Sequence, residues 1–392
     1  MTLRKLIRKT FIKSHIQLTT TPTNHCYKSH QTMVTHHISL ALSLFIITLF
    51  TSIHGLHVPR VTGKELAASK LLRSGSKPFI LTDSMTQWES LTKFNKLEWF
   101  SENFPDAIVD YYPHNLAVTS KKPFLRKMSS VLNEFNVPNP KPKGGWSQNG
   151  RSEKARYIHW RMTAGQWNKV AELLTPMHDF FTTDKAWMKQ CIPKKIRNPK
   201  NKRQINWPMN NWIRHAHWKI IVIGEEDSSM FFHADGFSTS TFVFQFVGRK
   251  RWTLCKPDPE MKHMSNAGVI DTFGSQEHLD QFPRYKNADC KQFDVHPGEV
   301  IYYPSHYWHQ TLNLDRPCIS MAGRRVDGNN AHEVYGELQH RCKYPGPDIT
   351  KQWPGAAPNL SKRMCKNIGK CYEIWKDTMF DGEFGAEVKE EM

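Results

Sequence analysis

The sequence predicts a mainly β domain of the sandwich or barrel class, flanked by helices. Five short runs rich in β-branched and aromatic residues occupy the second half of the chain, at 218–223, 241–247, 251–255, 300–303 and 318–321. Glycine and proline turns separate these runs, and no long helical pattern intervenes. The chain has 392 residues, of which 39% are hydrophobic and 12% aromatic, so a sizeable core is expected.

The first half of the chain predicts the flanking helices and a few further strands. Residues 77–82, 107–112 and 157–162 have the composition of short strands, whereas 91–104 and 166–174 have helical patterns. Asparagine, proline, glycine and lysine dominate 133–154, which predicts a loop.

The N-terminus has the pattern of a secretory signal peptide or signal anchor. Residues 38–53 are apolar and uncharged, and six Lys or Arg precede them. This run of 16 residues lies between a signal peptide, with about 7–15 apolar residues, and a spanning helix, with about 20. Gly55 offers a small residue for cleavage before Leu56, and Met33 is an alternative start.

These patterns divide the chain into three parts. Residues 1–56 form a basic N-terminus with the signal or anchor, 57–340 a folded domain, and 341–392 a Lys/Pro-rich tail that contains cysteines. Residues from 57 onward are expected in the endoplasmic reticulum lumen, in the secreted protein, or on the lumenal side of a single-pass type II membrane protein. The protein meets a membrane only through 38–53, if that run stays uncleaved. A glycosylation sequon at Asn359 fits this location.

The charge and the cysteines limit the classes of partner. A net charge of +18 favours an acidic partner, and the run 189–203, with seven basic residues and no acid, is either a solvated loop or a surface for that partner. No RRM, KH or zinc-knuckle motif is present, so specific nucleic-acid binding is not expected. No CxxC pair occurs among the eight cysteines, which disfavours structural zinc. In an oxidising compartment, the cluster Cys342, Cys365 and Cys371 can supply a disulfide.

A histidine–aspartate pair and a later histidine have the composition of an iron site. His233 and Asp235 stand two residues apart, so in an extended segment they face the same side. His309 lies 76 residues downstream, and His306 is its competitor. Two histidines and one carboxylate on one face form the triad of non-haem Fe(II) oxygenases, which leaves three coordination positions open.

Three stretches of this sequence resemble JmjC-type hydroxylases, a cupin-like family. Residues 245–252 (QFVGRKRW) resemble the Q-x-x-G-x-K-R-W run of that family, residues 297–314 resemble its PGD…P…WWH…NL run, and residues 77–88 (KPFILTDSMTQW) resemble its N-terminal strand and turn. The resemblance extends over roughly 57–325 and places the chain in the small hydroxylase branch. It implies a double-stranded β-helix, or jelly roll, that uses Fe(II) and 2-oxoglutarate, with ascorbate as the expected reductant.

The resemblance also implies which residues form the site. The metal ligands correspond to His233, Asp235 and His309, the last chosen over His306 because the ligand in the family directly follows the aromatic residue. Lys250 corresponds to the lysine that pairs with the distal carboxylate of 2-oxoglutarate, with Tyr157 and Thr241 as further co-substrate contacts. No catalytic residue beyond the metal ligands is implied.

The chain departs from the family pattern at two positions near the co-substrate. Many relatives carry threonine three residues before the first histidine ligand, where this chain has Met230. The last strand lacks the usual pocket-facing residues, and Ser320 replaces them only if the strand register slips.

The resemblance predicts an enzyme that hydroxylates a protein side chain in the secretory pathway, an acidic protein being one candidate substrate. The alternative is a non-catalytic secreted cupin-like protein that keeps the fold and binds acidic matrix components. The complete triad and Lys250 favour the enzyme, whereas Met230 and Met321 favour the alternative.

Overall fold

The computed structural model describes residues 55–115, 123–135, 155–181, 219–258, 270–346, 359–362, 365–366 and 368–369. From Leu56 onward the chain forms one compact unit. The apolar run at 38–53 and the basic run at 189–203 lie outside the described residues. Within the described ranges, no helix is both long enough and apolar enough to cross a membrane.

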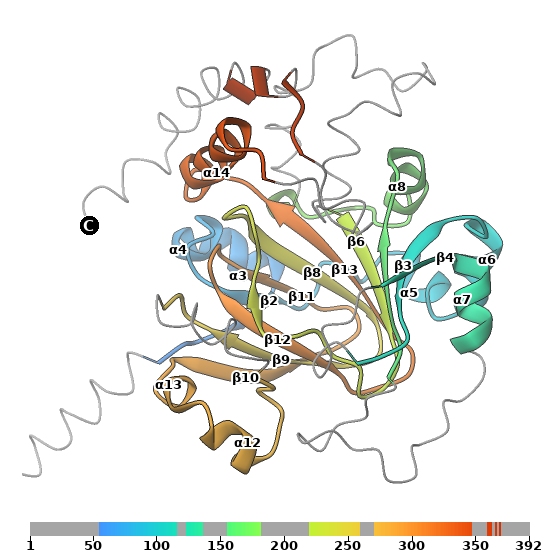
Figure 1. The fold of residues 1–392 in the computed structure, drawn as a ribbon, viewed down its shortest axis with the longest axis horizontal. Coiled ribbons are helices and arrows are strands. Elements are labelled where there is room, and N and C mark those ends of the chain that lie inside the picture. Colours follow the sequence, from blue (N-terminus) through green and yellow to red (C-terminus); the bar gives the residue numbers. More distant parts are fainter. Residues whose placement is uncertain are drawn as a thin grey trace, which may run out of the picture. The chain divides into compact units, whose positions relative to one another are not determined.

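Two β-sheets form the centre of this unit (Figure 1). All neighbouring strands pair antiparallel except β1 and β2. The larger sheet has the order β1 (Arg60–Val61), β2 (Phe79–Leu81), β11 (Val300–Tyr303), β8 (Ser240–Val247), β13 (Cys318–Arg325), β6 (Lys219–Gly224), β5 (Tyr157–Arg161), β3 (Ile108–Tyr112) and β4 (Phe124–Lys127). The smaller sheet has the order β10 (Cys290–Val295), β9 (Lys250–Cys255), β12 (Trp308–Asn313) and β7 (His233–Ala234).

The two sheets pack face to face, and helices cover the other face of the larger sheet. One apolar cluster joins Ile80, Val243 and Ile301 of the larger sheet to Trp252 and Leu254 of the smaller. A second cluster joins the larger sheet to the helices. Strands β2, β5 and β8 are therefore buried along nearly their whole length, as expected for strands covered on both faces. This arrangement confirms the predicted jelly-roll class.

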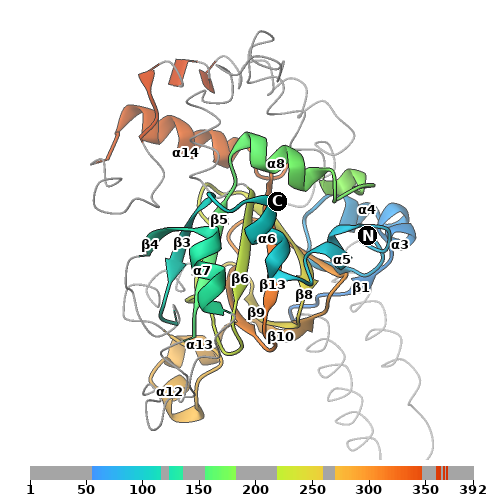
Figure 2. The same cartoon turned by 90° about the vertical axis from the view of Figure 1, so that its right-hand side faces the viewer.

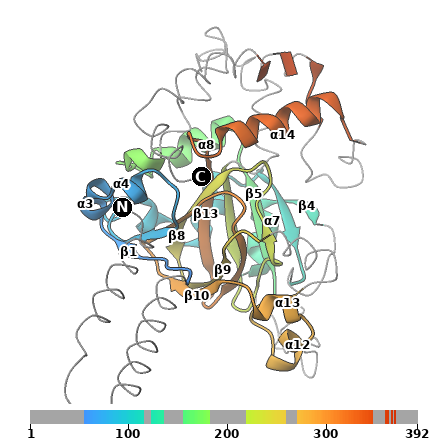
Figure 3. The same cartoon turned by 90° about the vertical axis from the view of Figure 1, so that its left-hand side faces the viewer.

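The helices lie around the sheets. Figures 2 and 3 show α14 crossing the end of the sheets opposite the α12–α13 pair, and Figure 2 shows α6 and α7 against the larger sheet. The helices are α3 (Gly63–Ala68), α4 (Lys70–Arg73), α5 (Ser90–Lys93), α6 (Leu97–Asn103), α7 (Met128–Phe135), α8 (Ala164–Ala171), α12 (Gln276–Asp280), α13 (Pro283–Lys286) and α14 (Ala331–Lys343).

The sequence patterns located the hydrophobic strands and missed the polar ones. The single helix expected at 91–104 is two helices, α5 and α6, interrupted at the buried ring of Phe94, which packs against Phe100 and Phe246. Strand β12 was not predicted because Gln310, Thr311 and Asn313 give it a polar composition, although all three are buried.

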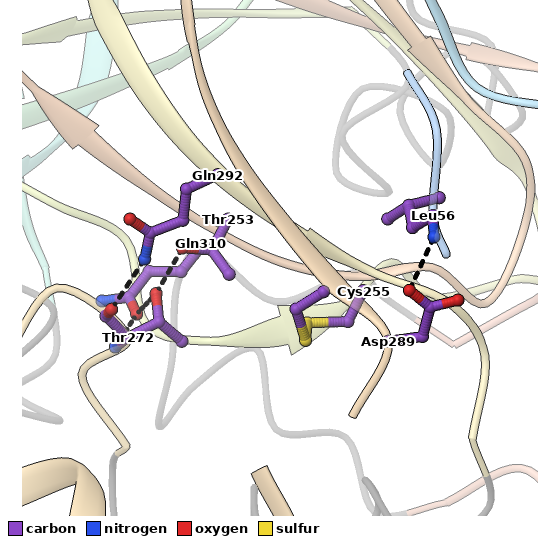
Figure 4. The surroundings of a disulfide bond; sticks show 8 residues. Leu56, Thr253, Cys255, Thr272, Asp289, Gln292 and Gln310 are labelled. Atoms are coloured by element: carbon purple, nitrogen blue, oxygen red, sulfur yellow. Dashed lines mark hydrogen bonds between the residues drawn. A yellow bond between two sulfur atoms is a disulfide. The ribbon is translucent and has the colours of Figure 1, made fainter. Parts of the chain in front are cut away.

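Two disulfides tie parts of the unit together. Cys342–Cys365 joins the end of α14 to the tail, within the predicted cluster, and Cys371 lies outside the described residues. Cys255–Cys290 joins β9 to β10 and was not foreseen. Figure 4 shows hydrogen bonds on either side of this disulfide. On one side the carboxylate of Asp289 accepts a hydrogen bond from the backbone amide of Leu56. On the other, Gln292 donates to the carbonyl of Thr272, and Gln310 accepts from the amide and hydroxyl of Thr272. Cys318 is a buried thiol.

Candidate metal and co-substrate site

Strand pairing brings the three predicted metal ligands together. His309 of β12 lies directly opposite His233 of β7, and Asp235 follows β7 by one residue. The two imidazole centroids are 4.3 Å apart. One ligand atom from each of the three residues lies within 4.8 Å of the others.

Hydrogen bonds from the backbone orient both imidazoles. Nδ1 of His233 lies 2.7 Å from the carbonyl of Phe231, and Nδ1 of His309 lies 3.2 Å from the carbonyl of Tyr307. A ring N–H that donates to these carbonyls leaves each Nε2 with a free lone pair, which is the usual arrangement of a metal-bound histidine. Both Nε2 atoms lie about 4 Å from Asp235, at 3.8 and 4.0 Å from its two oxygens.

Burial keeps the two histidines neutral. It lowers the pKa of His233, and it lowers the pKa of His309 to about 3. Neutral imidazoles are the form that binds a metal ion. His306, the competing candidate, lies outside this cluster on the surface, where it pairs with Glu333.

Asp235 is held by three side chains that flank the cluster. Thr241 and Tyr303 donate to its Oδ2 at 2.7 and 2.9 Å, and Arg324 donates to Oδ1 at 2.7 Å and also pairs with Oδ2. Burial alone would raise the pKa of Asp235, but the guanidinium of Arg324 holds it well below its usual range. Asp235 is therefore ionised and fixed in orientation before any ion binds.

Thr241 and Arg324 show what the sequence did and did not reveal. Thr241 was predicted to contact the co-substrate, which stays a prediction; in the structure its hydroxyl donates to Asp235, one of the candidate metal ligands. Arg324 was not foreseen, because a basic residue near a strand end gives no signal of burial. It is 9% exposed, and its contact with Asp235 connects residues 89 positions apart.

Lys250 is a buried cation between the two sheets. It shares a face of β9 with Trp252 and Leu254, which belong to the core, and it is 2% exposed. Its ammonium donates to Ser320 Oγ at 2.6 Å, and among the described residues no carboxylate pairs with it. Burial lowers the pKa of Lys250. Buried charges are normally paired, so this ammonium indicates a site for an anion.

Ser320 reaches Lys250 through an irregularity in the sheet. The register of β13 against β8 shifts between Ile319 and Ser320, which is the slip that the sequence required for Ser320 to face the pocket. The two neighbouring arginines form ion pairs with other residues: Arg249 pairs with Asp315, and Arg251 pairs with Asp294.

A buried acceptor lies close to Lys250. Asn313, opposite Lys250 in the β9–β12 ladder, has a buried side-chain carbonyl that no residue of the described ranges hydrogen-bonds. Tyr157 is buried beside Asn313 across Gly224, and burial raises the pKa of its hydroxyl. Met230, in the position of the family threonine, packs beside Tyr157 and Tyr112. Asn313 and Tyr157 therefore lie next to Lys250 or its strand partner, where the distal end of the co-substrate is predicted to bind.

Gly224 is expected to tolerate no side chain, because it lies against this pocket. An added Cβ would lie 2.0 Å from Nδ2 of Asn313 and 2.6 Å from Cδ2 of Tyr157. We expect Gly224→Ala to lower the unfolding free energy by about 1–3 kcal/mol, the usual cost of overpacking. Gly336→Ala is the matched control: nothing lies within 4 Å of that site on α14, and alanine should stabilise the helix by roughly 0.5–1 kcal/mol. Urea denaturation measures both, and a Gly224→Ala variant as stable as the wild type would contradict this packing.

Comparison with known proteins agrees with this geometry. The family model described as "Cupin-like domain" matches residues 66–322. The chain is 31% identical over 122 residues to the lysine-specific demethylase JMJ21 of Arabidopsis thaliana, 30% over 111 residues to an HSPB1-associated protein 1 homolog of Danio rerio, and 25% over 126 residues to the 2-oxoglutarate and iron-dependent oxygenase JMJD4 homolog of Drosophila melanogaster.

These matches cover part of each protein. They take in 29%, 25% and 32% of this chain and 13%, 23% and 28% of the three relatives, so the chain spans less than a third of the relatives' length. The family model, in contrast, covers well over half of the chain. With its two-sheet jelly roll and its His–Asp–His cluster, the chain belongs to the cupin-like (JmjC) domain family.

Proposed function

We propose that this protein is an Fe(II)- and 2-oxoglutarate-dependent oxygenase that hydroxylates a protein side chain in the secretory pathway. The observation that carries the proposal is the pairing of two features in one fold: a His–Asp–His cluster and, on the strand that pairs with the strand of His309, a buried ammonium that no carboxylate of the described residues neutralises. A relative whose name specifies iron and 2-oxoglutarate supports the same chemistry.

The residues present fit both groups. His233, Asp235 and His309 would hold the iron, and Lys250 with Ser320 would bind the distal carboxylate of 2-oxoglutarate. Iron, 2-oxoglutarate and O2 together would supply the oxidising power to hydroxylate a C–H bond, with succinate and CO2 as by-products. The chain's own residues would orient the site: Arg324 and Tyr303 hold Asp235, and Leu254, a buried apolar residue, lies opposite His309 in the β9–β12 ladder.

Succinate production tests the proposed chemistry. Purified protein from Leu56 onward, supplied with Fe(II), 2-oxoglutarate and ascorbate, should form succinate slowly alone and faster with lumenal or acidic proteins. Hydroxylation would appear as a mass increase of a substrate peptide. No succinate under any of these conditions, from protein that binds iron, would contradict the enzyme.

Location in the secretory pathway is a separate prediction. The Cys255–Cys290 and Cys342–Cys365 disulfides support it, because such bonds persist in oxidising compartments, and the sequon asparagine Asn359 is exposed. We expect the protein expressed in eukaryotic cells to lose mass on N-glycosidase treatment, and an Asn359→Gln variant to show no shift. A wild-type protein that stays cytosolic, unglycosylated and fully reduced would exclude this location.

One observation favours a second candidate, a secreted binding protein without catalysis. Arg324 neutralises Asp235 within the cluster, so the metal-free site has no unpaired carboxylate. The net charge of +18 would then serve to bind acidic matrix components. Metal titration separates the two: this candidate predicts heparin binding without Fe(II) binding.

A further inference from the structure

Helix α14 lies outside the segment that matches the family, which ends at residue 322, and its side chains contact loop residues close to the candidate metal ligands. The helix crosses the end of the sheets (Figures 2 and 3) and buries Ala331, Val334 and Leu338. Beside this buried face, Glu333, Glu337 and Arg341 are spaced four residues apart. Residues at this spacing line one side of a helix, here called the α14 flank.

The α14 flank contacts two loops next to the candidate metal ligands: the loop that begins at Asp235, after β7, and the loop that precedes His309 of β12. Ser238 donates to Glu337 at 2.5 Å, and the guanidinium of Arg341 lies 4.4 Å from the ring centroid of Phe237; both loop residues follow Asp235 within three positions. Glu333 pairs with His306, three residues before His309. One helix flank therefore contacts both of these loops.

The same loop residues have an unfavourable backbone conformation. Phe237, Ser238 and His306 have φ values of 66°, 48° and 65°. They are three of the four non-glycine residues with positive φ in the described part of the chain. Residues other than glycine hold this conformation only when their surroundings impose it, and such residues gather at functional sites. Each of the three is held by a side chain of the α14 flank.

We propose that the α14 flank is a clamp that positions His309 and Asp235 for the metal by holding the loops beside them. The inference rests on the proposed metal centre and adds to it a supporting element from outside the family domain. Glu333, Glu337 and Arg341 are positioning residues: each acts on the metal site through a loop residue. The anchoring of the helix N-terminus is consistent with this role, because Asn330 donates to Ser240 at 3.0 Å, just after the first loop.

The contact between Ser238 and Glu337 allows a sharp test, because both ends can be changed. Isothermal titration of the full chain with Mn²⁺ measures metal affinity. Glu337→Ala and Ser238→Ala should each weaken Mn²⁺ binding roughly tenfold, as outer-shell substitutions commonly do. The double variant should be no weaker than either single one, because both remove the same contact. Glu337→Gln keeps an acceptor oxygen and should restore the wild-type affinity.

The controls separate positioning from general stability. Gln339→Ala changes an exposed residue on the opposite side of α14 and should leave the affinity unchanged. Metal-free Glu337→Ala should unfold at the wild-type temperature, while its visible absorption with Co²⁺ should differ from the wild-type spectrum. If Glu337→Ala does not fold, Arg341→Met, which removes only the cation above Phe237, should weaken Mn²⁺ binding in its place.

The outcomes that oppose the clamp differ from those that oppose the metal centre. Wild-type Mn²⁺ affinity in Glu337→Ala, Ser238→Ala and Arg341→Met would overturn the clamp and leave the metal centre intact. Additive losses in the double variant would also overturn it, since the two residues would then act separately. A wild-type chain that binds no Mn²⁺ would overturn the metal centre and the clamp with it.

Discussion

His233→Ala and Asp235→Asn are expected to abolish Fe(II) binding, because each removes one of the three ligands that the strand pairing brings together. Two remaining ligands do not make the facial triad. Metal analysis of protein loaded without oxygen should find iron in the wild type and none in either variant. His296→Ala is the matched control, because this histidine is exposed and lies outside the cluster. Stoichiometric iron in both ligand variants would contradict the assignment of the site.

Substitutions of His233 and of Asp235 should differ in their effect on the free energy of unfolding, a difference that the sequence pattern alone does not suggest. His233 makes one hydrogen bond, to a backbone carbonyl, so its loss should have little effect on folding. Asp235 neutralises the buried Arg324, so Asp235→Ala should cost about 3–5 kcal/mol, the usual result of leaving a buried charge unpaired. Asp235→Asn keeps an acceptor oxygen and should lose less. Thermal unfolding of metal-free protein measures this order.

Lys250→Met is expected to destroy 2-oxoglutarate binding while sparing the metal. Losing one partner of a buried charge pair costs about 3–5 kcal/mol, which is more than a hundredfold in half-saturating 2-oxoglutarate. Mn²⁺ affinity should stay at the wild-type value, because the ammonium is not part of the ligand cluster. Arg249→Met and Arg251→Met are matched controls, since these neighbours pair with Asp315 and Asp294. If either arginine variant loses 2-oxoglutarate and Lys250→Met does not, the carboxylate is held elsewhere.

The same variant should stabilise the protein when 2-oxoglutarate is absent. Burial lowers the pKa of Lys250 in the folded state, so folding disfavours the charged lysine, and this penalty is present in full at pH values below the folded pKa. Methionine carries no charge to desolvate. The unfolding temperature of Lys250→Met should therefore exceed that of the wild type at neutral pH, and added 2-oxoglutarate should raise only the wild-type value.

The sequence by itself determined the fold class, and it predicted the three candidate metal ligands and the role of Lys250. The apolar strands such as β8 and β11 are visible because their composition matches burial on both faces. His233 and Asp235 are visible because a histidine and a carboxylate two residues apart face the same side of an extended segment, whereas the resemblance to the JmjC family selected His309 over His306.

Only the tertiary structure decided how these residues are supported. Ser320 contacts Lys250 because the register of β13 shifts. The other contacts join residues far apart in the sequence: Arg324 and Asp235 are separated by 89 residues, Cys255 and Cys290 by 35 residues, and Glu337 and Ser238 by 99 residues. Each contact depends on which strands are neighbours and in what register they pair. Strand order and register depend on the packing of the whole sheet, so no local pattern of residues contains them.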